Sequence, residues 1–169
     1  LASGEVEIAT YPEEACDGET SDVSAIWMPD FYGDTIVVNG VTWPYLEVEA
    51  RRYRLRFING SDSRTLILHM EDGTPFHQIG ASGGYLPEPV QQAELLLGPA
   101  ERADVIVDFS QVPADTQITL LNVGPDGPFH GGTSGEDFAA ADQETTGQVM
   151  QFRIVPATDA DPSTPVEDL

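Results

Sequence analysis

Basic residues are scarce in this sequence, and lysine is missing altogether. Seven arginines face 29 acidic residues, which gives a formal net charge of −22 at pH 7. A surface with this charge repels phosphate backbones, and most of the arginines lie within strand-like sequence at 51, 52, 54, 56 and 64 instead of forming a basic groove. Nucleic acid is therefore excluded as the expected partner, and the charge is better explained by solubility, including solubility at high salt.

Long apolar runs are absent as well. No stretch approaches the roughly 18 apolar residues of a membrane-spanning helix, and the segment after Leu1 lacks both the basic and the apolar part of a signal peptide. No membrane partner is expected, and the missing initiator methionine suggests a fragment or a processed product. The single cysteine, Cys16, cannot form an internal disulfide and lies in a polar stretch far from any histidine, which favours an incidental thiol.

Helical periodicity is the third absence. No segment of about 12 residues carries a helical apolar stripe, so helix is expected only as single turns, for example near 99–102. Short alternating segments bounded by Gly, Pro, Asp or Asn predict strands at 35–39, 41–45, 52–57, 65–70, 76–80, 93–97, 103–109, 117–123 and 148–155. Many short strands with regular turns predict an all-β sandwich or barrel in a single domain, which 169 residues are enough to build.

Two local patterns are especially clear. Asn39-Gly40 separates two strand-like segments and is typical of a tight primed turn, and Pro44 is expected to shorten the second strand or place it at a sheet edge. From Arg52 to Phe57, arginines alternate with aromatic and aliphatic residues, which is typical of a half-buried strand.

Three parts are expected along the chain. Residues 1–32 show no sustained periodicity and are interpreted as an N-terminal linker or arm, with at most one short strand near 6–8. Residues 33–155 form the predicted domain, and the proline-spaced segment 156–169 is interpreted as a C-terminal linker. Within the domain, the Gly-rich acidic segment 124–147 predicts a loop that is mobile or contacts another molecule.

Metal-ligand patterns are weak. The histidines His69, His77 and His130 are isolated from one another and from Cys16, so surface or packing roles are expected for them. Asp159 and Asp161 lack the glycine and the distal glutamate of a calcium loop and are interpreted as part of a solvated tail. Asn59-Gly60-Ser61 is formally a glycosylation sequon, but a turn closing the preceding strand is the preferred interpretation.

Three ordered segments carry a family resemblance. They are GDTIVVNGVTWPYLEVEARRYRLRFING at 33–60, FHQIGASGGYLPEPV at 76–90 and LLGPAERADVIVDFS at 96–110. They resemble the middle cupredoxin domain of three-domain multicopper oxidases of the spore-coat laccase and bilirubin oxidase type. The resemblance extends more loosely through LLNVGPDGPFHGG and GQVMQFRIV.

The resemblance implies a Greek-key, cupredoxin-like fold and a role. In that family, phenolic, bilirubin-like or metal-ion donors are oxidised, dioxygen is reduced to water, and the copper ligands belong to the first and third domains. This chain is then expected to be the copper-free middle domain, with no catalytic or metal-binding residue of its own. Its expected partners are the flanking cupredoxin domains of the same polypeptide, and it is expected to expose an apolar flank that would allow the isolated fragment to self-associate.

Only scaffold residues transfer from the family motifs. They are Asn39, Gly40, Trp43, Pro44, Asn59, Gly80, Gly83, Gly84, Pro99, Glu101 and Arg102. Two features depart from the family pattern: Ser82 replaces the usual aspartate before Gly83-Gly84, and the segment before Gly33 lacks the usual strand-rich entry. An ion pair involving Glu101 and Arg102 is expected to fix how its loop enters the following strand.

Two alternatives stay open at this point. The chain could be a free-standing β-sandwich binding or adhesion module without redox activity, which self-associates or uses the 124–147 loop to hold a ligand. It could also be the product of proteolysis of a larger chain. The compartment is not determined, although an extracellular or cell-envelope location is slightly favoured for the parent enzyme.

Overall fold

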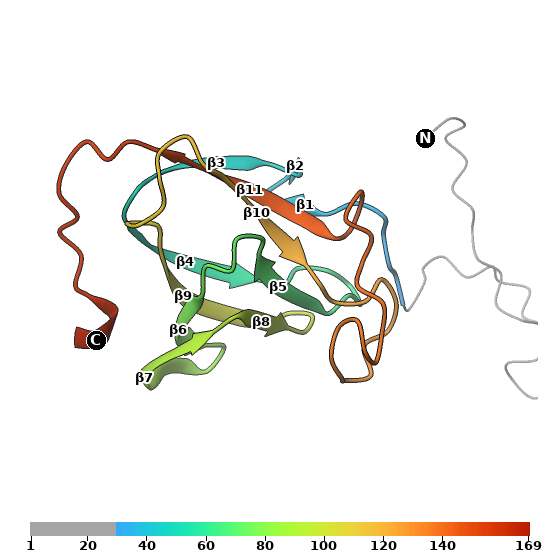
Figure 1. The fold of residues 1–169 in the computed structure, drawn as a ribbon. Coiled ribbons are helices and arrows are strands. Elements are labelled where there is room, and N and C mark those ends of the chain that lie inside the picture. Colours follow the sequence, from blue (N-terminus) through green and yellow to red (C-terminus); the bar gives the residue numbers. More distant parts are fainter. Residues whose placement is uncertain (1–29) are drawn as a thin grey trace, which may run out of the picture. The chain divides into compact units, whose positions relative to one another are not determined.

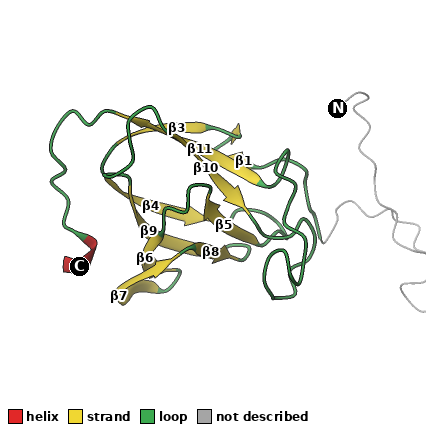
Figure 2. Cartoon of the chain, in the orientation of Figure 1, coloured by secondary structure: helices red, strands yellow, loops and turns green. Residues whose placement is uncertain are grey.

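The computed structural model of the chain describes residues 30–169. The chain divides into residues 1–31 and residues 32–169, and the second unit contains the strands. They are β1 (Val37–Val38), β2 (Val41–Thr42), β3 (Tyr45–Glu49), β4 (Arg52–Ile58), β5 (Leu66–Met70), β6 (Phe76–Ala81), β7 (Gly84–Gln92), β8 (Glu94–Leu97), β9 (Arg102–Asp108), β10 (Gln117–Asn122) and β11 (Gln148–Val155). A 3₁₀ turn at Val166–Asp168 is the one helical element of the described range (Figure 2).

Two sheets form the body of the fold. One has the strand order β3-β11-β10-β5-β8 and the other the order β4-β9-β6-β7, while β1 and β2 form a separate small ribbon (Figure 1). The chain changes sheet at nearly every step, and only the β6–β7 and β10–β11 pairs are consecutive neighbours within one of the two sheets. The predicted all-β, cupredoxin-like class is therefore confirmed.

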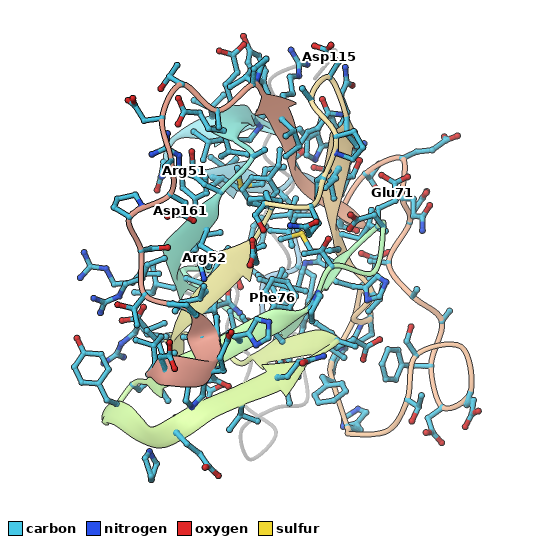
Figure 3. The ribbon with its side chains drawn as sticks, turned by 60° about the vertical axis from the view of Figure 1, so that its left-hand side comes forward. Arg51, Arg52, Glu71, Phe76, Asp115 and Asp161 are labelled. Carbon is cyan, nitrogen blue, oxygen red and sulfur yellow. The ribbon has the colours of Figure 1, made fainter. Side chains whose placement is uncertain are left out.

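The core lies between the two sheets. Phe76, Phe109 and Phe152 are fully buried there, and Phe109 packs at 5.2 Å from Phe152 across tilted rings. Figure 3 shows Phe76 in the interior between the strands. Burial of each such side chain contributes about 2–3 kcal/mol to the free energy of folding. β4 has the predicted alternation, because Arg54 and Arg56 are exposed whereas Leu55 and Phe57 are partly buried.

β7 is a strand that the sequence did not predict, and most of β3 was also missed, because the predicted segment 41–45 reaches only its first residue. Pro87 and Pro89 cannot donate backbone hydrogen bonds, and Gly83-Gly84 precedes them, so the segment has the composition of a turn. The structure places β7 at the edge of the four-stranded sheet, where only one side must pair. An edge position is the one that tolerates proline, which explains the difference.

Two expected local elements also differ from the structure. The segment 41–45 is broken: β2 ends at Thr42 and β3 begins at Tyr45, so Pro44 interrupts the strand, and β3 lies at a sheet edge. The helical turn expected near 99–102 is a tight turn instead, in which the Glu101 N–H donates to the Gly98 carbonyl at 3.0 Å. Its backbone includes Ala100 at φ 64°.

Several expectations concern parts outside the described residues. The short strand expected near 6–8 and Cys16 lie outside them. The domain boundaries expected after residues 32 and 155 fall inside the described range and stay predictions. Within the described range, no helix is long and apolar enough to span a membrane.

Candidate functional site

The turn from β1 to β3 has an unusual backbone. Asn39, Gly40 and Trp43 all have positive φ, at 50°, 85° and 43°. Asn and Gly tolerate this region, whereas a bulky residue rarely adopts it without support from its surroundings. The Trp43 N–H donates to the Ile36 carbonyl at 3.4 Å, and the Pro44 carbonyl accepts from the Gln151 N–H at 3.0 Å. The Trp43 bond thus closes the ribbon on itself, and the Pro44 bond joins the chain after the ribbon to β11.

This turn raises a group of apolar side chains to the surface. We call them the hairpin surface: Val37, Val41, Trp43, Tyr45 and Leu46, each between 39% and 56% exposed. No charged residue occurs from Thr35 to Leu46, although the chain as a whole is strongly acidic. The five side chains do not share one face, because Val37 and Val41 lie on opposite faces of the β1–β2 ribbon and Tyr45 and Leu46 are successive residues of β3.

A shallow pocket of about 220 Å³ adjoins the hairpin surface. It is lined by Trp43, Pro44, Tyr45, Thr119, Gln148, Met150, Gln151 and Arg153. The guanidinium carbon of Arg153 lies 3.7 Å from the centre of the Tyr45 ring, and its Nε donates to Gln151 Oε1 at 2.9 Å. Within residues 30–169, Arg153 forms no ion pair with an acidic side chain.

Asn59 lies at the centre of the turn after β4. It is 1% exposed, and its Nδ2 donates to the carbonyls of Arg64 at 2.7 Å and Leu97 at 2.9 Å. Its Oδ1 accepts from the N–H of Ser61 at 3.0 Å, and its carbonyl accepts from the N–H of Ala100 at 2.8 Å. Asn59 thus joins two turns through a satisfied buried amide, and its amide nitrogen is not accessible for glycosylation in the folded state.

The expected ion pair at 101 and 102 does not form. Glu101 Oε2 accepts from the Gly98 N–H at 2.8 Å, and Arg102 donates to the Ala100 carbonyl at 2.7 Å, so both side chains stabilise the turn individually. Their acidic neighbour Asp104 pairs with Arg54 on β4, whose Nε lies 2.8 Å from Asp104 Oδ1. The hydrogen bond with Arg54 lowers the pKa of Asp104 below its ordinary value.

The glycine turn between β6 and β7 uses Ser82 in an unexpected way. Ser82 Oγ accepts from the backbone N–H of Arg102 at 3.0 Å, so the residue that departs from the family pattern still joins two strand ends. The pentapeptide 80–84 formally matches the Gly-x-Ser-x-Gly pattern of a serine nucleophile. That pattern requires a strand followed by a helix, whereas here the segment connects two strands, which excludes the match.

The remaining scaffold positions shape the same turns. A Cβ at Gly80 would lie 3.2 Å from both Asp104 Cβ and the Gly84 carbonyl, at the irregularity where β6 changes register. Gly83 has open space around it, and Gly84 has a positive φ of 137°. Pro99 lies in the 98–101 turn. The scaffold role of these positions stays a prediction.

Arg64 anchors the long loop between β10 and β11. Its side chain is 5% exposed; Nη2 donates to the Gly33 carbonyl at 2.5 Å, and Nη1 donates to the Asp126 carbonyl at 3.0 Å and to Asp126 Oδ1 at 2.8 Å. The Tyr32 ring lies 5.7 Å from the Arg64 guanidinium carbon. The base of the 124–147 loop is therefore tied to the body by a buried cation that sequence patterns did not single out.

Asp126 completes this anchor. Its carboxylate also accepts hydrogen bonds from the Thr146 hydroxyl and, at 3.3 Å, from the Asp142 N–H. Partial burial acts to raise the pKa of Asp126, but the hydrogen bonds from Thr146 and Asp142, together with Arg64, hold the pKa below its ordinary value. The ionised carboxylate thus links the start of the 124–147 loop to its end through Asp142 and Thr146.

The segment after β11 is held along β4. Asp161 Oδ2 accepts from the backbone N–H of Arg52 at 2.9 Å and from its Nε at 3.2 Å, and Arg52 Nη2 donates to the Ser163 carbonyl at 3.3 Å (Figure 3). Thr158 donates to Glu49 Oε1 at 2.7 Å. The Arg52 N–H, followed by Ser163, lowers the pKa of Asp161 below its ordinary value. Asp161 thus holds this segment against β4, and the interpretation of Asp161 as part of a solvated tail is wrong.

The histidines do not come together. His69 lies on β5, and its Nδ1 is 3.3 Å from the Ala93 carbonyl. His77 lies on β6 opposite Gln91, and His130 is exposed in the long loop. In the part of the chain that the structure describes, no three His, Cys, Asp or Glu side chains are grouped as metal ligands. Copper needs several nitrogen or sulfur ligands at one point, so these residues do not fit a copper site.

Curated relatives of this chain are laccases and multicopper oxidases. The laccase of Bacillus stratosphericus is 41% identical over 138 residues, which cover 82% of this chain and 24% of that protein. The laccase of Haloferax volcanii is 36% identical over an alignment that covers 99% of this chain and 28% of the relative. The chain thus spans about a quarter of the curated relatives that it matches. No family model matches it.

The fold agrees with the sequence relationship. The solved structure of the McoA multicopper oxidase from Aquifex aeolicus superimposes with a TM-score of 0.66 at 32% identity, over 83% of this chain and 30% of that one. Both comparisons cover about a quarter to a third of a larger protein. This chain belongs to the multicopper oxidase family.

Proposed function

We propose that this chain is the copper-free middle domain of a laccase-like multicopper oxidase. In this role it holds together two copper-bearing cupredoxin domains that precede and follow it in the same polypeptide. The parent enzyme would oxidise phenolic, bilirubin-like or metal-ion donors and reduce dioxygen to water. An extracellular or cell-envelope location of the parent enzyme belongs to the same proposal.

One observation carries the proposal. A family defined by copper is matched over about a quarter to a third of its length by a domain whose described residues hold no group of copper ligands. A copper-free domain inside a copper enzyme contributes through structure, because it cannot accept electrons from the donor. The hairpin surface supports a bridging role, since it offers apolar area for a neighbour to cover.

The attachment of residues 156–163 supports the same role. A bridging domain must control where the following chain departs, and the Arg52–Asp161 contacts hold that segment against the edge strand β4. The side chains of Arg52 and Asp161 are only 19% and 15% exposed, so solvent weakens their ion pair less than it would a surface pair. The chain beyond Asp161 thus starts from a fixed place on the domain.

The coding sequence on either side of this chain tests the proposal. We expect His-x-His pairs upstream, and His-x-x-His-x-His together with His-Cys-His downstream, because these spacings supply the imidazole and thiolate ligands of the copper centres. Start and stop codons close to the two ends, with no such motif between them and the chain, would favour the free-standing binding or adhesion module instead.

A further inference from the structure

The pocket beside Trp43 is built on one face of three adjacent strands, which follow the order β3-β11-β10 (Figure 1). Tyr45 on β3 is the register partner of Gln151 on β11, and Gln151 is the partner of Thr119 on β10, so the three side chains project from the same face of the sheet. Arg153 follows Gln151 by two residues and shares this face. The volume of about 220 Å³ is smaller than the roughly 300–1,000 Å³ of pockets for drug-sized ligands, which suits a ligand of one ring.

Arg153 brings an oriented cation with unused donors into this pocket. Its guanidinium carbon lies 3.7 Å from the centre of the Tyr45 ring, and its Nε donates to Gln151 Oε1. Glu47 is the register partner of Arg153, yet within residues 30–169 the two form no ion pair, and the guanidinium lies over Tyr45 instead. The two Nη groups are therefore available as a planar pair of donors, which matches the two oxygens of a carboxylate.

Trp43 supplies an aromatic wall from a strained backbone. Its φ is 43°, in a region that a bulky residue adopts only when the surrounding structure holds it there. Strain of this kind is found preferentially at binding and catalytic sites. Trp43 lines the pocket together with Tyr45, and both side chains are exposed. Aromatic side chains beside an oriented guanidinium favour a ligand that carries both a ring and an anionic group.

We propose that this pocket binds a small aromatic carboxylate. The carboxylate of the ligand accepts hydrogen bonds from the Nη groups of Arg153, and its ring packs against Trp43 and Tyr45. Thr119 and Gln148 also line the pocket and offer a hydroxyl and an amide to a polar substituent on the ring. This binding adds a ligand site to the bridging role and does not depend on that role.

Photoaffinity labelling of the complete polypeptide with 4-azidobenzoate tests the site. The probe has the ring and the carboxylate, light converts its azide to a nitrene that attaches to nearby residues, and mass spectrometry locates the label. We expect label within 43–45 and 148–153 that saturates with the probe concentration and that benzoate displaces. Benzamide is the matched neutral competitor, and it should be at least about ten-fold less effective, because it lacks the charge that Arg153 recognises. Absence of label from these segments, or equal competition by benzamide and benzoate, would overturn the site.

Substitutions near the guanidinium give an independent measurement. Arg153→Gln should weaken labelling of the two segments at least about ten-fold, and Arg153→Lys, which keeps the charge without the planar donors, should fall between it and the wild type. Arg102→Gln is the matched control, because Arg102 is exposed and donates to the Ala100 carbonyl outside the pocket, and it should leave the labelling unchanged.

Glu47→Gln should strengthen labelling, because it removes a carboxylate that repels the one on the ligand. Glu47 is exposed and takes part in no ion pair of the described residues, so this variant tests the site even if Arg153→Gln does not fold. Labelling of a folded Arg153→Gln variant at the wild-type level, or weaker labelling of Glu47→Gln, would contradict the proposal. The copper content of the polypeptide is not changed by either result, so the bridging role is tested separately.

Discussion

Replacement of Arg64 by methionine should destabilise the domain strongly. The guanidinium is 5% exposed and donates to the carbonyls of Gly33 and Asp126 and to the Asp126 carboxylate. Methionine fills a similar volume but donates nothing, so the carbonyls of Gly33, Pro125 and Asp126 lose the Arg64 donor. The Asp126 carboxylate keeps only the hydrogen bonds from Thr146 and Asp142. Removal of one partner of a buried ion pair costs about 3–5 kcal/mol. Because the Asp126 side chain is 50% exposed and can be hydrated, the low end, about 3 kcal/mol, is expected.

Chemical denaturation of the complete polypeptide and of the variant measures this loss. Arg64→Lys keeps the charge but not the planar set of donors, so its free energy of unfolding should fall between those of the wild type and Arg64→Met. Arg102→Met is the matched control, because Arg102 is exposed and donates only to the Ala100 carbonyl. Its effect should stay within about 0.5 kcal/mol of the wild type.

The structure also predicts which part of the domain Arg64→Met destabilises first. Hydrogen exchange should accelerate in the 124–147 loop of Arg64→Met before the β4–β9 pair exchanges, since the loop loses its anchor while the sheet is intact. The reasoning is refuted if Arg64→Met unfolds at the same denaturant concentration as the wild type, or if its exchange increases evenly over the whole domain.

Four further predictions follow from particular contacts. Asn59→Ala should lower the free energy of unfolding by about 2–3 kcal/mol, because the Leu97 and Arg64 carbonyls lose the Asn59 amide and the Ser61 N–H loses its acceptor; a loss below about 0.5 kcal/mol in urea denaturation would contradict this. Gly147→Ala should lower the thermal midpoint, because its Cβ would lie 2.6 Å from the Ala141 carbonyl; an unchanged midpoint would refute the close approach. Asp161→Asn should speed proteolysis within 156–163 at neutral pH. The pKa of Asp161 is lower in the folded state than in the unfolded chain. The carboxylate therefore stabilises the attachment of 156–163 above the unfolded-state pKa of about 3.9, and this stabilisation is lost as the pH falls below that value. The proteolysis rates of wild type and variant should converge in acid. Added salt should raise the thermal midpoint of the wild type, because screening relieves the repulsion of a chain with net charge −22, and a falling midpoint would contradict this.

The sequence predicted the strands wherever side-chain alternation is pronounced. β4 is the clearest example, since its exposed and partly buried residues alternate from Tyr53 to Ile58. In β11 the buried Phe152 and Ile154 alternate with partly buried neighbours, whereas β9 is buried continuously from Val105 to Val107. β7 was missed because its prolines are acceptable only at a sheet edge, and edge position depends on topology that local patterns do not contain. Pro44 was expected to shorten the strand at 41–45 or to place it at a sheet edge; the division into β2 and β3 and the positive φ of Trp43 were not predicted.

The candidate site was predicted less completely. An exposed apolar flank was expected from the family resemblance, but its composition required the structure, because Val41 and Leu46 have the same local pattern as core residues. Arg64 and Asp161 act through partners 62 and 109 positions away, Asp126 and Arg52. Contacts at that separation depend on the whole fold and leave no local signal.

The copper content of the 169-residue chain tests the central claim most directly. The chain is saturated with Cu(II), dialysed and compared with the complete polypeptide by metal analysis and absorbance, with its β-sheet circular dichroism as the check of folding. The account predicts copper and a blue absorbance band in the complete polypeptide, and well under one copper per chain without such a band in the isolated chain. Near-stoichiometric copper with a blue band in the isolated chain would contradict it.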